Sequence, residues 1–154
     1  MELLKRVIVA IIFIPLLLVV YYLGNTPLLV FLGLVSFAGM WEMRNIIQEG
    51  KKFYIPVLLI PLSIPVFLLC AVQGFEYINF AIIGTFIIVA GNNVIMNKIE
   101  HTASIIGFSL MAMVYTVIMP ASIYRISAHF PDYKLVLLLQ VFCWTTDSFA
   151  YFVG

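Results

Sequence analysis

Long apolar segments follow one another along this chain and are separated by short polar stretches. The segments can be drawn at residues 7–23, 27–43, 55–72, 77–96, 103–124 and 135–153. A helix needs roughly 20 apolar residues to cross a hydrocarbon core of about 30 Å, and most of these segments approach that length. The pattern predicts an all-α, polytopic membrane protein with about six transmembrane helices, forming a single transmembrane domain over residues 1–154.

Prolines and a turn that begins with a glycine indicate where these helices are interrupted. The sequence Gly-Asn-Thr-Pro at residues 24–27 is expected to form a tight turn between the first two segments. Pro61 and Pro65 each remove an intrahelical hydrogen bond, so the third helix is expected to be kinked. Pro120 is expected to kink the fifth helix for the same reason.

Two further features bear on how the helices pack. Asn92 and Asn93, near the end of the fourth segment, require hydrogen-bond partners inside the bundle or among the lipid headgroups. Ala103 and Gly107 form a small-xxx-small pair, a pattern that is compatible with close packing of two transmembrane helices.

The composition agrees with a membrane location and excludes some partners. The chain is 64% hydrophobic and 10% charged, whereas soluble domains have about 25% charged residues. The apolar surplus must therefore face lipid. The net charge of +1 gives no strong field for nucleic acid, so no nucleic-acid partner is expected, and an anionic ligand must be held locally by a few groups.

The distribution of basic residues predicts the orientation in the cell (inner) membrane. Loops on the cytoplasmic side of membrane proteins carry an excess of Lys and Arg. Of the eight basic residues, six fall on the side of the N-terminus and two on the other. The six are Lys5, Arg6, Arg44, Lys51, Lys52 and Lys98, and the two are Arg125 and Lys134. Both termini of a six-span chain are therefore expected in the cytoplasm.

The last segment carries a carboxylate, Asp147, in an otherwise apolar helix. Insertion of a carboxylate at mid-membrane costs at least about 2.5–3.5 kcal/mol, so such a residue is a functional candidate. Helical spacing puts Gln140, Trp144, Asp147 and Tyr151 on one polar stripe, with Thr146 and Ser148 beside it. A lone carboxylate there suits a hard cation, a proton or a hydroxyl-rich ligand. The alternative is that it reaches the membrane interface or bonds within its own helix.

The residues around Asp147 resemble a motif of the phosphatidate cytidylyltransferase (CDP-diacylglycerol synthase) family. The stretch is Trp-x-x-Asp-Ser-x-Ala-Tyr-x-x-Gly, from Trp144 to Gly154, and the family commonly has Thr where this chain has Ser148. Lys5-Arg6 before the first segment and Trp41-Glu42 at the end of the second also resemble family positions. The likeness covers essentially the whole chain.

The resemblance implies a reaction and roles for the residues. It implies transfer of a cytidylyl group from CTP to phosphatidate, with CDP-diacylglycerol and pyrophosphate as products. Asp147 would be the catalytic residue and one ligand of an incomplete Mg²⁺ site. Glu42 and Arg44 are weaker candidates, since the pair also fits an interfacial ion pair at a helix end. The substrate-binding candidates around Asp147 are Trp144, Thr146, Ser148 and Tyr151.

This sequence also departs from the family pattern. The family continues with a Ser-Pro-Lys-Lys-Thr-x-Glu-Gly loop and a signature containing His-Gly-Gly and Asp-Arg-x-Asp, which residues 1–154 lack. We therefore expect the chain to be the N-terminal part of such an enzyme and inactive alone. Two other classes stay open: a transporter or channel fragment with Asp147 as an ion or proton site, and a non-catalytic membrane assembly protein. A homodimer is compatible with the sequence.

Overall fold

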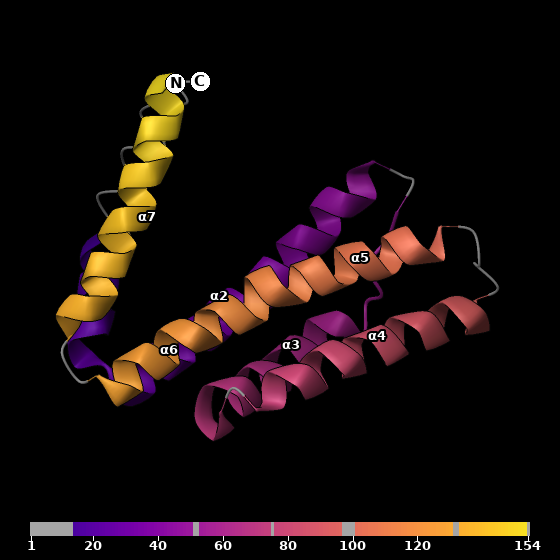
Figure 1. Ribbon diagram of the computed structural model, residues 1–154, viewed down its shortest axis with the longest axis horizontal. Coiled ribbons are helices and arrows are strands. Elements are labelled where there is room, and N and C mark those ends of the chain that lie inside the picture. Colours follow the sequence, from indigo (N-terminus) through magenta and orange to yellow (C-terminus); the bar gives the residue numbers. More distant parts are fainter. Residues whose placement is uncertain (1–13, 51–52, 75, 97–100, 131–132, 154) are drawn as a thin grey trace. The chain divides into compact units, whose positions relative to one another are not determined.

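The structure, a computed structural model, is all-helical over the residues it describes, which are 14–50, 53–74, 76–96, 101–130 and 133–153 (Figure 1). The helices follow the order in which the apolar segments occur. They are Ile14–Leu23, α2 (Asn25–Glu49), α3 (Leu59–Leu68), η1 (Leu69–Gln73), α4 (Tyr77–Ile95), α5 (Thr102–Met113), η2 (Val114–Ile118), α6 (Met119–His129) and α7 (Tyr133–Val153).

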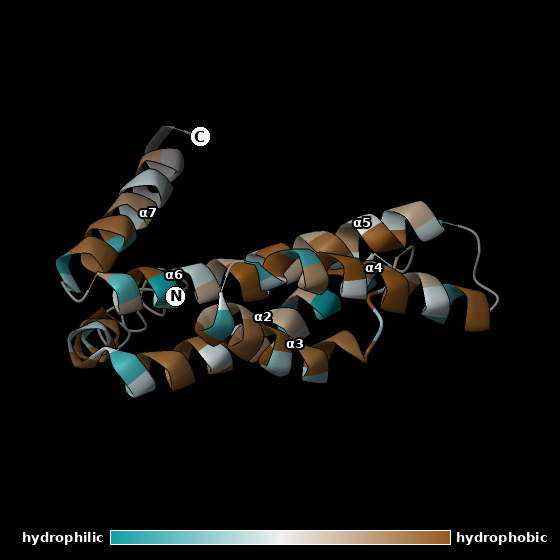
Figure 2. Ribbon diagram, turned by 60° about the horizontal axis from the view of Figure 1, so that its bottom comes forward, coloured by the Kyte–Doolittle hydropathy of each residue, from teal (hydrophilic) through white to brown (hydrophobic). Residues whose placement is uncertain are grey.

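Three helices within the described ranges are long and apolar enough to cross a membrane. They are Asn25–Glu49, Tyr77–Ile95 and Thr102–His129, the last formed by α5, η2 and α6 without a break. Shorter apolar helices occupy Ile14–Leu23, Leu59–Gln73 and Tyr133–Thr146. Hydrophobic residues run along α3, α4 and α5 (Figure 2). The predicted all-α class is confirmed, and three of the expected spans reach membrane-crossing length.

The chain divides into two compact units, which are described separately below. The first consists of residues Met1–Leu29 and Ile126–Gly154, and the second of Val30–Arg125. In the first unit, the helix Ile14–Leu23 packs against α7. In the second unit, α3, α4, α5 and the two π-helical turns η1 and η2 pack together, and most of α2 belongs to the same unit.

Of the prolines predicted to disturb two helices, Pro120 follows directly on a π-helical turn. The turn η2 ends two residues before Pro120, whereas η1 begins four residues after Pro65 and so lies beyond the turn that Pro65 interrupts. Proline lacks an N–H and its ring clashes with the carbonyl four residues earlier, so the regular hydrogen-bond ladder cannot continue past it. A π-turn absorbs this interruption within a continuous helix. In η2, the Met119 N–H accordingly reaches back to the Val114 carbonyl.

Close helix packing in the second unit depends on glycines of α2. A Cβ placed on Gly33 would lie 3.4 Å from the Phe67 ring, and one on Gly39 would lie 3.3 Å from Thr116 Cγ2. Ser36, between them, is fully buried. The predicted use of Ala103 and Gly107 for packing is wrong. Both positions are exposed, and nothing lies within 4 Å of a Cβ added at Gly107.

Two turns depend on backbone angles that favour glycine. Gly24 (φ +57°) and Asn25 (φ +42°) join Ile14–Leu23 to α2, which agrees with the predicted turn. Gly74 (φ +137°) separates η1 from α4. The Arg125 guanidinium lies against Gly74 and donates from Nη1 to the Ala71 carbonyl at 3.5 Å. A cation is well placed there, because the C-terminal end of a helix presents unpaired carbonyl oxygens.

Candidate functional site

The polar stripe of α7 faces the helix Ile14–Leu23 over its first turns. Tyr21 is 4% exposed and its hydroxyl donates to Gln140 Oε1 at 3.1 Å. Tyr133 meets Tyr22 edge to face, with ring centroids 5.7 Å apart. Because Tyr133 and Gln140 are seven residues apart, they lie on one side of α7, and that side is turned towards the first helix.

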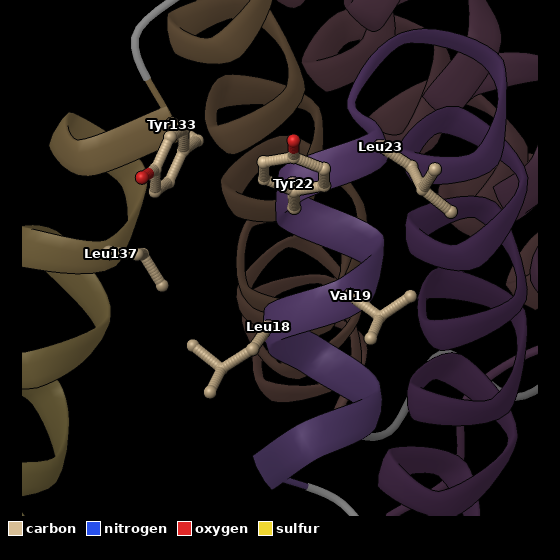
Figure 3. A pocket seen from close by; sticks show the side chains of 6 residues that line it. All are labelled: Leu18, Val19, Tyr22, Leu23, Tyr133 and Leu137. Carbon is tan, nitrogen blue, oxygen red and sulfur yellow. The ribbon is translucent and has the colours of Figure 1, made fainter.

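An apolar groove lies between these two helices, next to the Tyr22–Tyr133 contact. It has a volume of about 320 Å³. Figure 3 shows Leu18 and Tyr22 on one wall and Tyr133 and Leu137 on the other. The lining is almost entirely hydrocarbon, and Tyr22 and Tyr133 are the residues in it that carry hydroxyl groups.

The opposite side of α7 is apolar and exposed. Its exposed apolar residues include Leu138, Leu139, Phe142 and Phe149. The helix therefore has one side engaged with Ile14–Leu23 and another suited to lipid.

Asp147 lies on α7 two helical turns beyond Gln140. From Tyr133 to Asp147 the helix rises about 21 Å, at 1.5 Å per residue. The side chains of Asp147, Ser148 and Tyr151 lie outside the described part of the structure, so their predicted contacts stay predictions. Position 147 continues the seven-residue spacing of Tyr133 and Gln140, which keeps it on the same stripe of the helix.

Of the substrate-binding candidates around Asp147, the structure describes the side chains of Trp144 and Thr146. Trp144 is half-buried. Thr146 is exposed, and its hydroxyl donates to the Phe142 carbonyl at 2.8 Å, one turn back along α7. Thr145 makes the same bond to Val141 at 2.6 Å. A threonine bonded in this way keeps its lone pairs, so it can still accept a hydrogen bond from a ligand.

The two weaker candidates, Glu42 and Arg44, lie near the C-terminal end of α2 in the second unit. Glu42 is exposed. Arg44 is half-buried and donates from Nε to the Ile55 carbonyl at 3.1 Å. Arg44 thus joins the end of α2 to the segment that precedes α3.

A polar cluster in the second unit contains residues that the sequence did not join. Tyr54 donates its hydroxyl to Asn93 Oδ1, and Asn92 Nδ2 lies 3.4 Å from the Tyr54 hydroxyl. The sequence indicated that Asn92 and Asn93 need partners, and the structure provides one for Asn93 Oδ1, whereas Asn93 Nδ2 has none. Their partner is a tyrosine about forty residues away, and no local pattern reveals such a pairing.

The Mg²⁺ ion implied by the resemblance would need several oxygen ligands close together. Among the described side chains, no three His, Cys, Asp or Glu residues come together. One carboxylate cannot hold Mg²⁺ without further oxygen ligands or substrate phosphates. The described residues therefore do not form a complete metal site.

These features define an all-helical protein with membrane-length apolar helices and a polar stripe along its last helix. The sequence profile of the cytidylyltransferase family matches residues 4–154, which is nearly the whole chain. The chain belongs to the cytidylyltransferase family. No curated protein and no solved structure matches it. The family resemblance drawn from the residues around Asp147 is thereby confirmed, and it indicates a nucleotidyltransferase that uses CTP.

Proposed function

We propose that this protein takes part in the transfer of a cytidylyl group from CTP to phosphatidate. In this reaction a phosphate oxygen of phosphatidate attacks the α-phosphorus of CTP. The bond between the α-phosphorus and the bridging oxygen to the β-phosphate breaks, and pyrophosphate leaves with the electron pair. The products are CDP-diacylglycerol and pyrophosphate. The family match over residues 4–154 is the observation that carries this proposal.

Asp147 is the residue that we assign to the reacting phosphates. Its support is the motif from Trp144 to Gly154 and the position of Asp147 on the stripe that contains Gln140. Phosphoryl transfer requires positioning and neutralisation of charge more than covalent chemistry. By the family resemblance, Asp147 would be one ligand of a Mg²⁺ ion, which would supply positive charge for the phosphates of CTP. Trp144, Thr146, Ser148 and Tyr151 would surround that position.

Residues 1–154 supply only a part of the groups that this reaction needs. A triphosphate is bound by several cationic side chains, and in the resembled family a Lys-Lys loop lies beyond the Asp-containing helix. We therefore expect purified residues 1–154 to form no CDP-diacylglycerol from radiolabelled CTP and phosphatidate. Robust turnover by this polypeptide alone would contradict that expectation.

A chimera tests the function and Asp147 together. Residues 1–154 replace the corresponding part of an active family enzyme, and product formation is measured in membranes. We expect activity, and we expect Asp147→Asn to lower it by about 10²–10³-fold, the usual effect of losing one group that stabilises charge in the transition state. Glu76→Gln, at an exposed carboxylate outside α7, is the matched control and should leave the rate unchanged.

Two outcomes of the chimera experiment count against the proposal. An inserted and folded chimera that makes no product would overturn the assignment of the reaction. An active chimera that tolerates Asp147→Asn would remove Asp147 from the site while leaving the reaction intact.

A further inference from the structure

The polar cluster of the second unit gathers groups from three parts of the chain at one end of its helices. Tyr54 precedes α3, Asn92 and Asn93 lie in the last turn of α4, and Arg44 from α2 bonds the carbonyl next to Tyr54. Phe53 adds a contact with His101, whose ring centroid lies 5.7 Å away at the start of α5. In Figure 1 these ends of α4 and α5 lie side by side.

The cluster contains a buried hydrogen-bond donor without an acceptor. Asn93 is 1% exposed, and its Nδ2 has no hydrogen-bond partner. Asn92 Nδ2 makes only long contacts, at 3.4 Å to the Tyr54 hydroxyl and 3.7 Å to Met96 Sδ. A buried amide N–H₂ without a partner is costly, and such groups in folded proteins call for a ligand, a water or an ion. The missing partner must therefore be an acceptor.

Helix lengths place this cluster at the level of the lipid headgroups. A hydrocarbon core of about 30 Å takes about 20 helical residues, and α2 continues for 25, so Arg44 falls where the core ends. The 19 residues of α4 span about 28 Å, which puts Asn92 and Asn93 at its interfacial end. Phosphate oxygens are the abundant anionic acceptors at that depth.

We infer that Arg44, Asn92 and Asn93 form a binding site for a phosphate monoester, with Tyr54 holding the Asn93 amide in place. Phosphate oxygens accept hydrogen bonds from the amide Nδ2 atoms, and the guanidinium neutralises their charge. Tyr54, Asn92 and Arg44 are half-buried and form the accessible side of the cluster. That the bound monoester is the headgroup of phosphatidate rests on the proposed function. The existence of the phosphate site does not.

The test is direct binding to the full chain in detergent, measured by native mass spectrometry during titration with dioleoyl phosphatidate. We expect phosphatidate to bind better than phosphatidylcholine. Asn93→Leu and Arg44→Gln should each weaken phosphatidate binding about tenfold or more, which corresponds to one lost hydrogen bond to a charged group. Competition by glycerol 3-phosphate distinguishes recognition of a free phosphate monoester from recognition that needs the lipid.

Matched variants separate this site from general effects of polarity and charge. Asn79→Leu makes the same substitution at an exposed position near the start of α4, and Lys134→Gln removes one positive charge from the other unit. Both should bind phosphatidate like the unmodified chain. If Asn93→Leu fails to fold, Arg44→Gln decides the question. Equal binding by all variants, or no preference of the unmodified chain for phosphatidate, overturns the site. Because no CTP or turnover is involved, either result leaves the reaction to be judged by the chimera.

Discussion

The contact between Gly39 of α2 and Thr116 of η2 predicts a large and position-specific effect of adding a side chain. A Cβ on Gly39 would meet Thr116 Cγ2 at 3.3 Å and Thr116 Cβ at 3.4 Å, so a leucine there has to displace the neighbouring helix. At Gly107 the same substitution meets nothing within 4 Å. Replacing a helical glycine gains up to about 1 kcal/mol of helix propensity at both sites, whereas overpacking costs about 1–3 kcal/mol at Gly39 alone.

The expected difference between Gly39→Leu and Gly107→Leu is therefore the overpacking cost, about 1–3 kcal/mol. For a chain of this size it lowers the unfolding temperature of Gly39→Leu by about 2–12 °C relative to Gly107→Leu. Thermal unfolding of the full chain in detergent measures the difference. Equal unfolding temperatures of the two variants would refute the close approach.

A double-mutant cycle identifies the atom responsible. Thr116→Ser removes Cγ2 but keeps the hydroxyl that donates to the Ala112 carbonyl at 2.8 Å. Any destabilisation by Gly39→Ala should shrink in the Thr116→Ser background, because the closest atom is gone. If the two substitutions are additive within about 0.5 kcal/mol, Thr116 is not the neighbour that limits the space.

Two further predictions concern single contacts, both measured by thermal unfolding of the full chain. Tyr21→Phe removes the hydrogen bond to Gln140 and should destabilise the protein by about 1 kcal/mol. The control Tyr22→Phe, at a ring that is 73% exposed, should change stability by less than half of that amount. Similar effects of the two substitutions would argue against the Tyr21–Gln140 bond. Gly74→Ala gives a residue with a side chain the backbone angle φ +137° and should lower the free energy of unfolding by about 1–3 kcal/mol. The control Gly91→Ala, inside α4 with open space around it, should be neutral or stabilising. An unchanged stability of Gly74→Ala would contradict the turn between η1 and α4.

The hydrophobic pattern predicted the helices well because their length and apolar character are properties of local sequence. The segment expected at residues 77–96 corresponds to α4, and the segment at 135–153 corresponds to α7. The helix expected at 27–43 instead continues to Glu49. Polar residues end an apolar segment without ending a helix, so hydropathy locates the edge of the hydrocarbon core better than the end of the helix.

Packing partners were harder to predict than helices. The pair Ala103 and Gly107 matched a packing pattern, yet the close approaches lie at Gly33 and Gly39. In a membrane protein the lipid-facing and protein-facing sides of a helix are both apolar, so small residues alone do not reveal which side is buried. The sequence could not indicate Tyr54 as the partner of Asn93 either. That contact depends on how the segment before α3 lies against the end of α4, 39 residues further along the chain.

In the candidate site too, the features that depend on local sequence could be predicted, and those that depend on distant parts of the chain could not. The stripe on α7 follows from helical spacing, and the bond from Tyr21 to Gln140 confirms its orientation at that level. The role of Asp147 depends on groups brought to it by other parts of the protein, so spacing alone cannot establish it. A carboxylate on this stripe is costly unless something compensates its charge, and in the proposed reaction a metal ion bound with the substrate phosphates would provide that compensation. Asp147→Asn should then impair transfer without destabilising the fold, whereas a carboxylate bonded within its own helix would show the opposite pattern.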